Sequence, residues 1–254
     1  MAIITVVGAG VLGLTSAYRL LQEGHKVTVV ARHIPGDINA HYTSPFAGAN
    51  WASFATLEDK FQQELDKPAY REFVRLAETD PTAAIHKVWE RRYIRKSQLQ
   101  KDGSIQYPWF SDFVDGFRTV ELKDIPETVT VAEDHDPVVG AYEYKTVTIT
   151  TSLYLVWLLH KVEALGRKLL RRNLKHIDEA YSLPHTGQKA DLVVNATGLL
   201  ASKLGGVEDK KVYPIRGQIV RVRNNFPLQV SIKIPTHVGE TFYAFPRKEG
   251  GGII

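Results

Sequence analysis

A glycine-rich turn between a short strand and a helix constrains the fold of this chain more than any other feature. Residues 3–7 are all β-branched, which is typical of a strand buried on both faces. Gly8-Ala9-Gly10-Val11-Leu12-Gly13 follows, and residues 14–23 then show helical spacing of apolar side chains up to Gly24. Residues 26–31 form a second apolar strand. This βαβ unit predicts a parallel sheet and an α/β fold.

The spacing of these glycines predicts phosphate binding. In a strand–turn–helix context, Gly8 allows the tight turn, Gly10 lets the backbone approach a pyrophosphate, and Gly13 lets the helix pack closely on the sheet. The first turn of the helix offers free N–H groups and the positive end of the helix dipole. We therefore expect a dinucleotide to bind with its phosphates at this turn.

Arg32 stands where the second strand ends. Dinucleotide-binding folds usually carry an acidic residue there, which accepts hydrogen bonds from the ribose hydroxyls. An arginine cannot accept a hydrogen bond. Arg32 could pair with the 2′-phosphate of NADP, stack on adenine, clasp the diphosphate or be solvated, and its position alone leaves these alternatives open.

A third apolar strand, residues 190–195, ends at Ala196-Thr197-Gly198. Small residues at a strand end let the backbone pass close to a ligand. This strand resembles the second cofactor contact of FAD-binding Rossmann proteins. Between the second and third strands, residues 68–79 and 82–89 have helical patterns, and residues 93–143 have the short alternating runs of an inserted antiparallel region.

Composition excludes several other chemistries. The chain has no cysteine, so disulfides, thiolate metal sites and a cysteine nucleophile are absent, and its nine histidines show no metal-ligand spacing. The 32 basic and 28 acidic residues are mostly interspersed, which argues against a nucleic-acid patch. The longest apolar runs, such as Leu153–Leu159, are too short to span a bilayer. We expect no metal, no nucleic acid and no membrane partner.

Five segments together resemble the D-amino-acid oxidase family of FAD enzymes, which includes D-aspartate oxidases. They are residues 6–14, 43–51, 194–198, 214–218 and 243–247. The segment Thr43-Ser44-Pro45-Phe46-Ala47-Gly48-Ala49-Asn50-Trp51 is the most specific, and order and spacing agree over essentially all 254 residues. The chain looks most similar to fungal members, several of which carry a basic residue where Arg32 stands. This similarity favours FAD over NADP.

The resemblance implies a fold and a domain organisation. The expected fold class is α/β, with a glutathione-reductase-like, FAD-binding Rossmann domain and a mixed-sheet substrate domain. We expect the FAD domain to be discontinuous, with residues 1–75 plus 145–215. Residues 76–144 plus 216–254 would form the substrate domain.

The resemblance also implies a reaction. A D-amino acid would be oxidatively deaminated to a 2-oxo acid and ammonia by hydride transfer from Cα to flavin N5, with dioxygen as the second substrate and hydrogen peroxide as a product. No protein general base is required, because the cofactor carries the chemistry. Two alternatives are a related glycine or sarcosine oxidase and an inactive protein that keeps the nucleotide-binding fold. An NADP reductase is a more distant one.

Site residues follow from the resemblance, position by position. No side chain is expected to be catalytic, and Tyr243 would orient the substrate by binding its carboxylate, with Phe54 in the pocket wall. Lys233 and His237 are candidates for binding an acidic side chain, so the choice between neutral and acidic D-amino acids is open. The expected FAD contacts are Gly8, Ala9, Gly10, Val11, Leu12, Gly13, Arg32, Thr43, Ser44, Gly48, Ala49, Asn50, Leu174, Thr197 and Gly198.

The end of the sequence prompts a further expectation. Gly250-Gly251-Gly252-Ile253-Ile254 has the pattern of a turn and the first residues of a strand, so we expect the chain to be a fragment. The family's carboxylate-binding arginine and a second tyrosine would lie beyond residue 254. We therefore expect the chain alone to bind FAD poorly and not to turn over. Family members are largely peroxisomal, so a peroxisomal location is expected. The oligomeric state is open, with a homodimer as one alternative.

Overall fold

The computed structural model describes residues 1–130, 136–166, 168–234 and 241–254. The chain divides into two compact units, and each unit takes two segments of the sequence. Unit 1 comprises residues 1–47 and 151–217, and unit 2 comprises residues 48–150 and 218–254.

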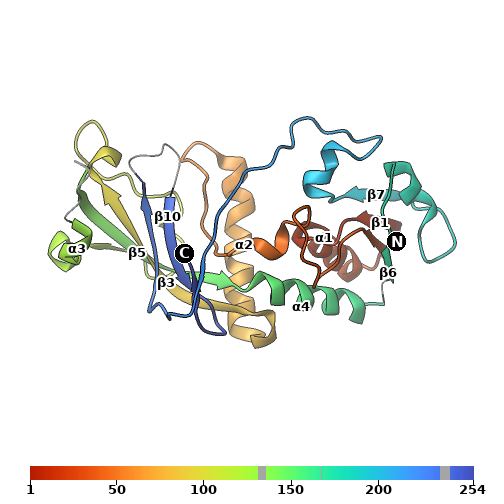
Figure 1. The fold of residues 1–254 in the computed structure, drawn as a ribbon, viewed down its shortest axis with the longest axis horizontal. Helices are drawn as coiled ribbons and strands as arrows, with labels where there is room; N and C mark the ends of the chain where they lie inside the picture. The colour runs from red at the N-terminus through yellow and green to blue at the C-terminus, as the bar shows by residue number, and fades with distance from the viewer. Residues whose placement is uncertain (131–135, 167, 235–240) are drawn as a thin grey trace. The chain divides into compact units, whose positions relative to one another are not determined.

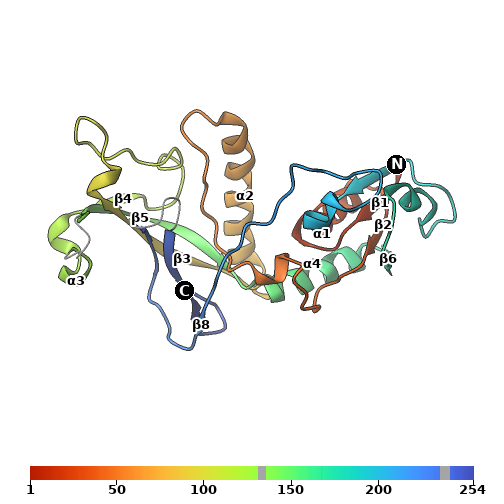
Figure 2. The ribbon, with the colours of Figure 1, turned by 45° about the horizontal axis from the view of Figure 1, so that its top comes forward.

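Unit 1 is built on a four-stranded parallel sheet (Figure 1). The strand order is β6-β2-β1-β7, with β1 at Ile3–Val7, β2 at Lys26–Ala31, β6 at Lys168–Arg171 and β7 at Leu192–Asn195. Two helices, α1 (Val11–Gln22) and α4 (Thr151–Ala164), pack against each other beside this sheet (Figure 2). The central strands β1 and β2 carry the buried apolar core of this sheet, whereas the edge strands β6 and β7 are partly exposed.

The predicted βαβ unit forms as the pattern indicates. Strand β1 pairs in parallel with β2 along the whole length of β1, and β7 pairs with β1 on the other side. Helix α1 begins at Val11 rather than at the predicted Leu14, because Gly10 already acts as its N-cap. The three strands thus present their carboxyl ends at one edge of the sheet, next to the start of α1.

Unit 2 is built on a seven-stranded mixed sheet of order β4-β5-β3-β9-β10-β11-β8. Only the β3–β9 pairing is parallel among the pairings of this sheet in the described part of the chain. Helix α2 (Lys60–Thr79) packs on β3 and β5, and a short helix, α3 (Glu127–Thr130), lies beside β5. The strands are β3 at Ile85–Arg95, β4 at Arg118–Val120, β5 at Val138–Ile149, β8 at Arg221–Val222, β9 at Gln229–Lys233, β10 at Thr241–Pro246 and β11 at Gly252–Ile253.

Two expectations differ from the structure. Residues 82–89 do not form an α-helix. A 3-10 turn, Pro81–Ala83, includes the first two of them, and residues 85–89 belong to β3, which pairs with β5 throughout its length, so long-range strand pairing overrides a short local pattern. The first predicted domain boundary, at residue 75, also differs, because α2 packs on the sheet of unit 2 and residues 48–75 therefore belong to that unit.

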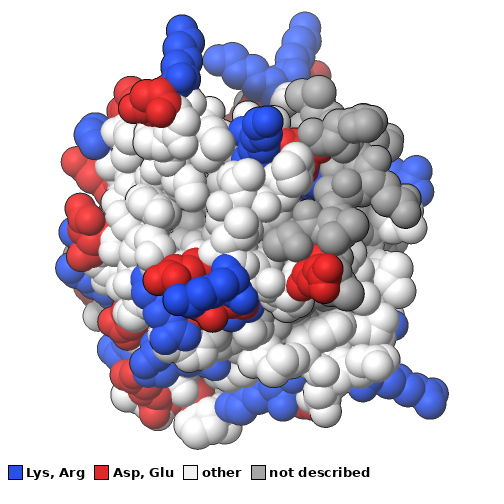
Figure 3. All heavy atoms as spheres, turned by 90° about the vertical axis from the view of Figure 1, so that its left-hand side faces the viewer, with Lys and Arg blue, Asp and Glu red and all other residues white. Residues whose placement is uncertain are grey.

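Charge is distributed without a single-sign field on the face drawn in Figure 3, where basic and acidic side chains are interspersed. One buried carboxylate, Glu143, carries two ion pairs, with Arg91 and Arg118, each at 2.6 Å. Burial alone would raise the pKa of Glu143, but hydrogen bonds and charge from these two arginines outweigh it and lower the pKa.

Neither of two further kinds of feature occurs among the described residues. Within residues 1–130, 136–166, 168–234 and 241–254, the helices do not combine the length and apolarity that a membrane span needs. The same ranges contain no group of three or more histidine, aspartate or glutamate side chains arranged to hold a metal ion.

Candidate functional site: a nucleotide pocket in unit 1

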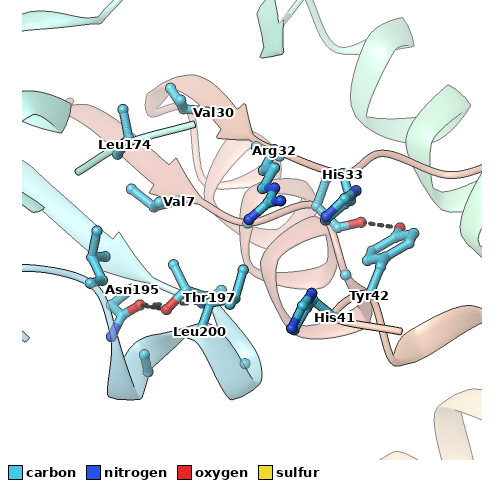
Figure 4. A pocket seen from close by; sticks show the side chains of 18 of the residues that line it. Val7, Val30, Arg32, His33, His41, Tyr42, Leu174, Asn195, Thr197 and Leu200 are labelled. Atoms are coloured by element: carbon cyan, nitrogen blue, oxygen red, sulfur yellow. Dashed lines mark hydrogen bonds between the residues drawn. The ribbon is translucent and has the colours of Figure 1, made fainter. Parts of the chain in front are cut away.

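A cavity of about 720 Å³ lies in unit 1 at the carboxyl ends of the parallel strands (Figure 4). Its walls come from the ends of β1, β2 and β7, the residues that follow β6, and the turn that precedes α1. Ligands of open parallel sheets bind at this edge because the loops there are free to diverge and the helix N-terminus points at them.

The glycines of the turn are required by close backbone packing. A Cβ on Gly8, which has a φ of +119°, would lie 2.2 Å from the carbonyl oxygen of Ala196. A Cβ on Gly13 would lie 2.0 Å from the carbonyl oxygen of Gly8. Both glycines therefore let β1, β7 and α1 approach one another, and this approach brings the first turn of α1 to the pocket.

The first turn of α1 is prepared for an anion. It contains no acidic residue. The N–H of Val11 donates to Ser44 Oγ at 3.1 Å, and the N–H of Leu14 donates to the carbonyl of Gly10 at 3.0 Å. The N–H groups of Leu12 and Gly13, which lie between them, have no acceptor within the helix. They are the donors that a phosphate would occupy.

Tyr42 and His33 support the turn from the side of β2. The Tyr42 hydroxyl donates to the carbonyl oxygen of Ala9 at 2.7 Å, and the bond is drawn in Figure 4. Burial, and secondarily the charge of Asp37, raises the pKa of Tyr42, so this hydroxyl keeps its proton and remains a donor. The His33 ring stacks on Tyr42 with a centroid distance of 6.1 Å.

The pocket is electropositive. No aspartate or glutamate is among the residues that line it in the described part of the chain, whereas four arginine and lysine residues are. They are Arg32, Arg172, Lys175 and Lys203. A lining of this kind suits a diphosphate, and the absence of an acid at the β2 end leaves Arg32 beside the place where ribose hydroxyls usually find a carboxylate.

Most predicted cofactor contacts come together in this pocket. Its lining includes Gly8, Ala9, Gly10, Val11, Leu12, Arg32, Thr43, Ser44, Leu174, Thr197 and Gly198. Gly13 lies just beneath it, in α1. Their roles in binding FAD stay predictions.

Several lining residues were not anticipated. They are His33, His41, Arg172, Lys175 and Lys203. The first four flank residues that the sequence did single out, namely Arg32, Thr43 and Leu174. Because β6 pairs in parallel with β2, the residues after β6 reach the same sheet edge, and recognising that pairing would have identified them.

The remaining predicted residues belong to unit 2. The segment that contains Gly48, Ala49 and Asn50 is fastened to β5: Ala49 and Ile149 exchange two backbone hydrogen bonds of 2.9 and 2.8 Å, and Asn50 bridges to Thr148. The predicted flavin loop therefore extends the unit 2 sheet beside β5. Its contact with a flavin stays a prediction.

Tyr243 lies in β10, directly opposite Ser231 of β9. Its ring stacks on Phe245 with a centroid distance of 5.6 Å and an interplanar angle of 22°. Phe54 is 92% exposed in this structure, so its side chain is not part of the core of unit 2. Lys233 is exposed at the end of β9, and His237 lies outside the described residues.

A buried polar cluster that the sequence did not reveal occupies the same face of the unit 2 sheet as Tyr243. Glu90 is completely buried and accepts hydrogen bonds from Arg92 at 3.0 Å, from Ser231 at 2.8 Å and from the Tyr144 hydroxyl. Burial raises the pKa of Tyr144 well above its ordinary value, with the Glu90 charge acting in the same direction, so Tyr144 stays a donor.

The parallel sheet, the glycine turn and the acid-free pocket together define a dinucleotide-binding α/β protein. Comparison with protein families narrows this class. Residues 4–254 match the DAO family, described as FAD dependent oxidoreductase, and the chain belongs to that family.

Individual relatives agree with this assignment. The chain is 40% identical over 261 residues to a D-amino-acid oxidase of Fusarium vanettenii, covering 99% of this chain and 69% of that protein. It is 33% identical over 258 residues to a D-amino-acid oxidase of Schizosaccharomyces pombe, covering 99% and 67%. The predicted family, the FAD cofactor and the enzyme type are confirmed by these matches.

Solved structures agree on the fold. The chain is similar to an L-proline dehydrogenase from P. horikoshii, with a TM-score of 0.67 at 15% identity over 99% of this chain and 68% of that one. A glycine oxidase from Geobacillus kaustophilus has a TM-score of 0.64 at 17% identity over 100% and 71%. At such identities the similarity concerns the fold alone, and it confirms the predicted fold class.

Proposed function

We propose that this protein catalyses the FAD-dependent oxidative deamination of D-amino acids. A D-amino acid, dioxygen and water would give a 2-oxo acid, ammonia and hydrogen peroxide. The observation that carries the proposal is the 40% identity to a D-amino-acid oxidase over 99% of this chain. It is supported by the cavity of about 720 Å³ that the glycine turn lines in unit 1.

The residues of unit 1 fit the diphosphate part of FAD. The free N–H groups of Leu12 and Gly13 would donate to the diphosphate oxygens, and the positive end of the α1 dipole would stabilise their charge. Arg32 would lie near the adenosine end. When bound, FAD supplies the two-electron acceptor for the substrate Cα–H bond and the group that dioxygen reoxidises.

The residues of unit 2 would orient the amino acid. We propose that the Tyr243 hydroxyl donates a hydrogen bond to the substrate carboxylate and that the loop Gly48–Asn50 contacts the flavin. Neither task requires a side chain that takes up a proton from Cα. The protein's contribution is therefore alignment, which can account for several orders of magnitude in rate.

The test is a peroxide assay on the purified full-length protein supplied with FAD. We expect peroxide from D-alanine or another D-amino acid, none from the L-enantiomers, and flavin absorbance that stays with the protein through gel filtration. Tyr243→Phe should raise KM by about 10- to 100-fold, because a hydrogen bond to a charged group contributes about 1.5–3 kcal/mol. A flavin-loaded protein that oxidises no D-amino acid would contradict the proposal.

The substrate panel also separates the alternatives. Glycine as the best substrate would support a glycine oxidase. Two solved glycine oxidases resemble this chain, but the resemblance concerns the fold alone. D-aspartate as the best substrate would indicate a preference for acidic substrates. Two D-aspartate oxidases are 27% and 25% identical to this chain, and these identities are lower than those of the two fungal D-amino-acid oxidases, 40% and 33%. We propose a neutral D-amino acid as the preferred substrate.

A peroxisomal location stays a proposal that rests on the family resemblance, and co-fractionation with a peroxisomal marker would test it. A homodimer also stays a prediction, which light scattering on the FAD-loaded protein would test.

A further inference from the structure

Strand β10 and the residue that follows it place three side chains in alternate positions. They are Tyr243, Phe245 and Arg247. Residues at i, i+2 and i+4 of an extended segment point to one face. The stacked rings of Tyr243 and Phe245 show that the first two share a face, and contacts with a single residue, Gly48, link the second and third.

Phe245 lies directly against the backbone of the Gly48–Asn50 loop. The side chain is 1% exposed. A Cβ on Gly48 would lie 2.2 Å from Phe245 Cζ, which is closer than any two such atoms approach, so the ring touches the Gly48 Cα without a side chain between them. The ring therefore sets how near the loop can come to β10.

Arg247 contacts the same glycine, Gly48, through a hydrogen bond. Its Nη2 donates to the Gly48 carbonyl oxygen at 3.0 Å. Its Nε is buried and has no hydrogen-bond partner among the described residues, and no carboxylate of these residues is within ion-pair distance. Burial and the nearby charge of Arg221 lower the pKa of Arg247, while Glu249 opposes them.

The Arg247 guanidinium makes few local bonds for a partly buried cation. A cation that is partly desolvated, lies near a second cation and makes one hydrogen bond to a neutral carbonyl is a poor stabiliser of a fold. A side chain that contributes so little to the stability of the fold is expected where it contributes to a functional site. What the bond does accomplish is to fix the position of the Gly48 peptide.

The other side of the loop is already fixed. Ala49 and Ile149 form a pair of backbone hydrogen bonds, and the backbone N–H of Trp51 donates to the Val147 carbonyl at 3.0 Å. The loop thus lies between β5, which holds it through the main chain, and β10, which holds it through Phe245 and Arg247. The β10 contacts are the ones that tie the loop to the strand bearing Tyr243.

We propose that Phe245 and Arg247 are positioning residues that hold the Gly48–Asn50 loop at a fixed distance from Tyr243. The proposal rests on the proposed function, in which this loop contacts the flavin and Tyr243 binds the substrate carboxylate. Tyr243 is part of β10 and the loop packs against β10, so the distance between them sets the position of the substrate Cα relative to the reacting cofactor. A misplacement of about 1 Å at such a site can cost about 100-fold in rate.

The test compares Arg247→Met, Arg247→Lys and Phe245→Leu with the control Lys248→Met. Lys248 follows Arg247 but is exposed and donates to the Pro81 carbonyl. Each variant is assayed for kcat and KM with D-alanine, for the Kd of FAD by fluorescence titration, and for Tm.

The expected signature is a split between kcat and KM. Arg247→Met should lower kcat by about 10- to 100-fold, with KM nearly unchanged because Tyr243 and the Phe245 ring that stacks on it are intact. Phe245→Leu should lower kcat by a similar factor. The Kd of FAD should rise by about tenfold for Arg247→Met, the equivalent of one lost hydrogen bond. Arg247→Lys keeps a cation and a donor and should recover most of both losses. Lys248→Met should match the unmodified protein.

Three outcomes would overturn the proposal. One is that Arg247→Met and Phe245→Leu keep kcat and the Kd of FAD within about twofold of the values of the unmodified protein. Such a result, with or without a change in Tm, indicates a structural role alone. A second is an equal loss in Lys248→Met. A third is no recovery in Arg247→Lys. If Arg247→Met does not fold, Arg247→Lys and Phe245→Leu decide. An unmodified protein that binds FAD but oxidises no D-amino acid refutes the proposed function, and the FAD titrations then still decide the positioning role.

Discussion

Replacing Gly13 by alanine tests whether the first turn of α1 binds the FAD diphosphate. The new Cβ would lie 2.0 Å from the Gly8 carbonyl oxygen, whereas real Cβ contacts stay beyond 3.0 Å. The helix or the turn must therefore shift by about 1 Å. Overpacking of this kind costs about 1–3 kcal/mol of the free energy of unfolding.

The same shift moves the free N–H groups of Leu12 and Gly13. An N–H···O bond is made at about 2.7–3.2 Å, so a displacement of about 1 Å breaks it. Each bond to a charged phosphate oxygen contributes about 1.5–3 kcal/mol. Losing one of them raises the Kd of FAD by about 10- to 100-fold, because about 1.4 kcal/mol corresponds to a factor of ten.

Gly24→Ala is the matched control. Gly24 has a φ of +82° and no neighbour within 4 Å of a built Cβ, so this substitution strains the backbone by about 1–2 kcal/mol without moving the turn. Both variants should lose stability in thermal unfolding, and only Gly13→Ala should lose FAD in a fluorescence titration. The reasoning is refuted if Gly13→Ala binds FAD within about threefold of the unmodified protein, or if Gly24→Ala loses FAD equally.

Three further predictions concern single contacts. Ser44→Ala removes the acceptor of the Val11 N–H and should raise the Kd of FAD by about tenfold; an unchanged titration would show that the turn holds its shape without it. Glu143 has a lowered pKa in the folded state, so its ion pairs stabilise the fold above its ordinary value of 4.5 and this contribution is lost as pH falls through the folded pKa. The urea midpoint of Glu143→Gln should therefore depend less on pH between about 3 and 6, and identical profiles would contradict this. Asp59 accepts from the Gln62 N–H at the start of α2, so Asp59→Ala should cost about 1 kcal/mol and lower Tm by about 2–4 °C; no change in Tm would exclude the cap.

The nucleotide-binding half of the site was predictable because its determinants are local. Gly8, Gly10 and Gly13 act within one turn, and the strands on either side are close in sequence, so spacing alone indicates which backbone groups face a phosphate. The family resemblance extended this to the FAD cofactor. The prediction that Thr197 and Gly198 contact the cofactor came from the resemblance and from the small residues that end their strand, and both line the pocket of unit 1.

Other features depend on pairings that no local pattern contains. The stretch from residue 82 to residue 89 has helical spacing, yet its partner β5 lies more than fifty positions away and makes most of it a strand. Whether residues 48–75 belong with the nucleotide pocket depends on which sheet α2 covers. Glu90 is an ordinary charged residue in the sequence, and its burial depends on donors from β5 and β9.

By itself, the sequence determined the βαβ unit, its glycine turn and the FAD family, because short-range backbone preferences and a few specific segments are enough to specify them. Only the tertiary structure decided that Arg172, Lys175 and Lys203 line the pocket and that Arg247 donates to the carbonyl of Gly48, nearly two hundred residues away. The physical reason is that a side chain's partners are set by which strands pair, and strand pairing is settled by the burial of the whole sheet rather than by any one segment.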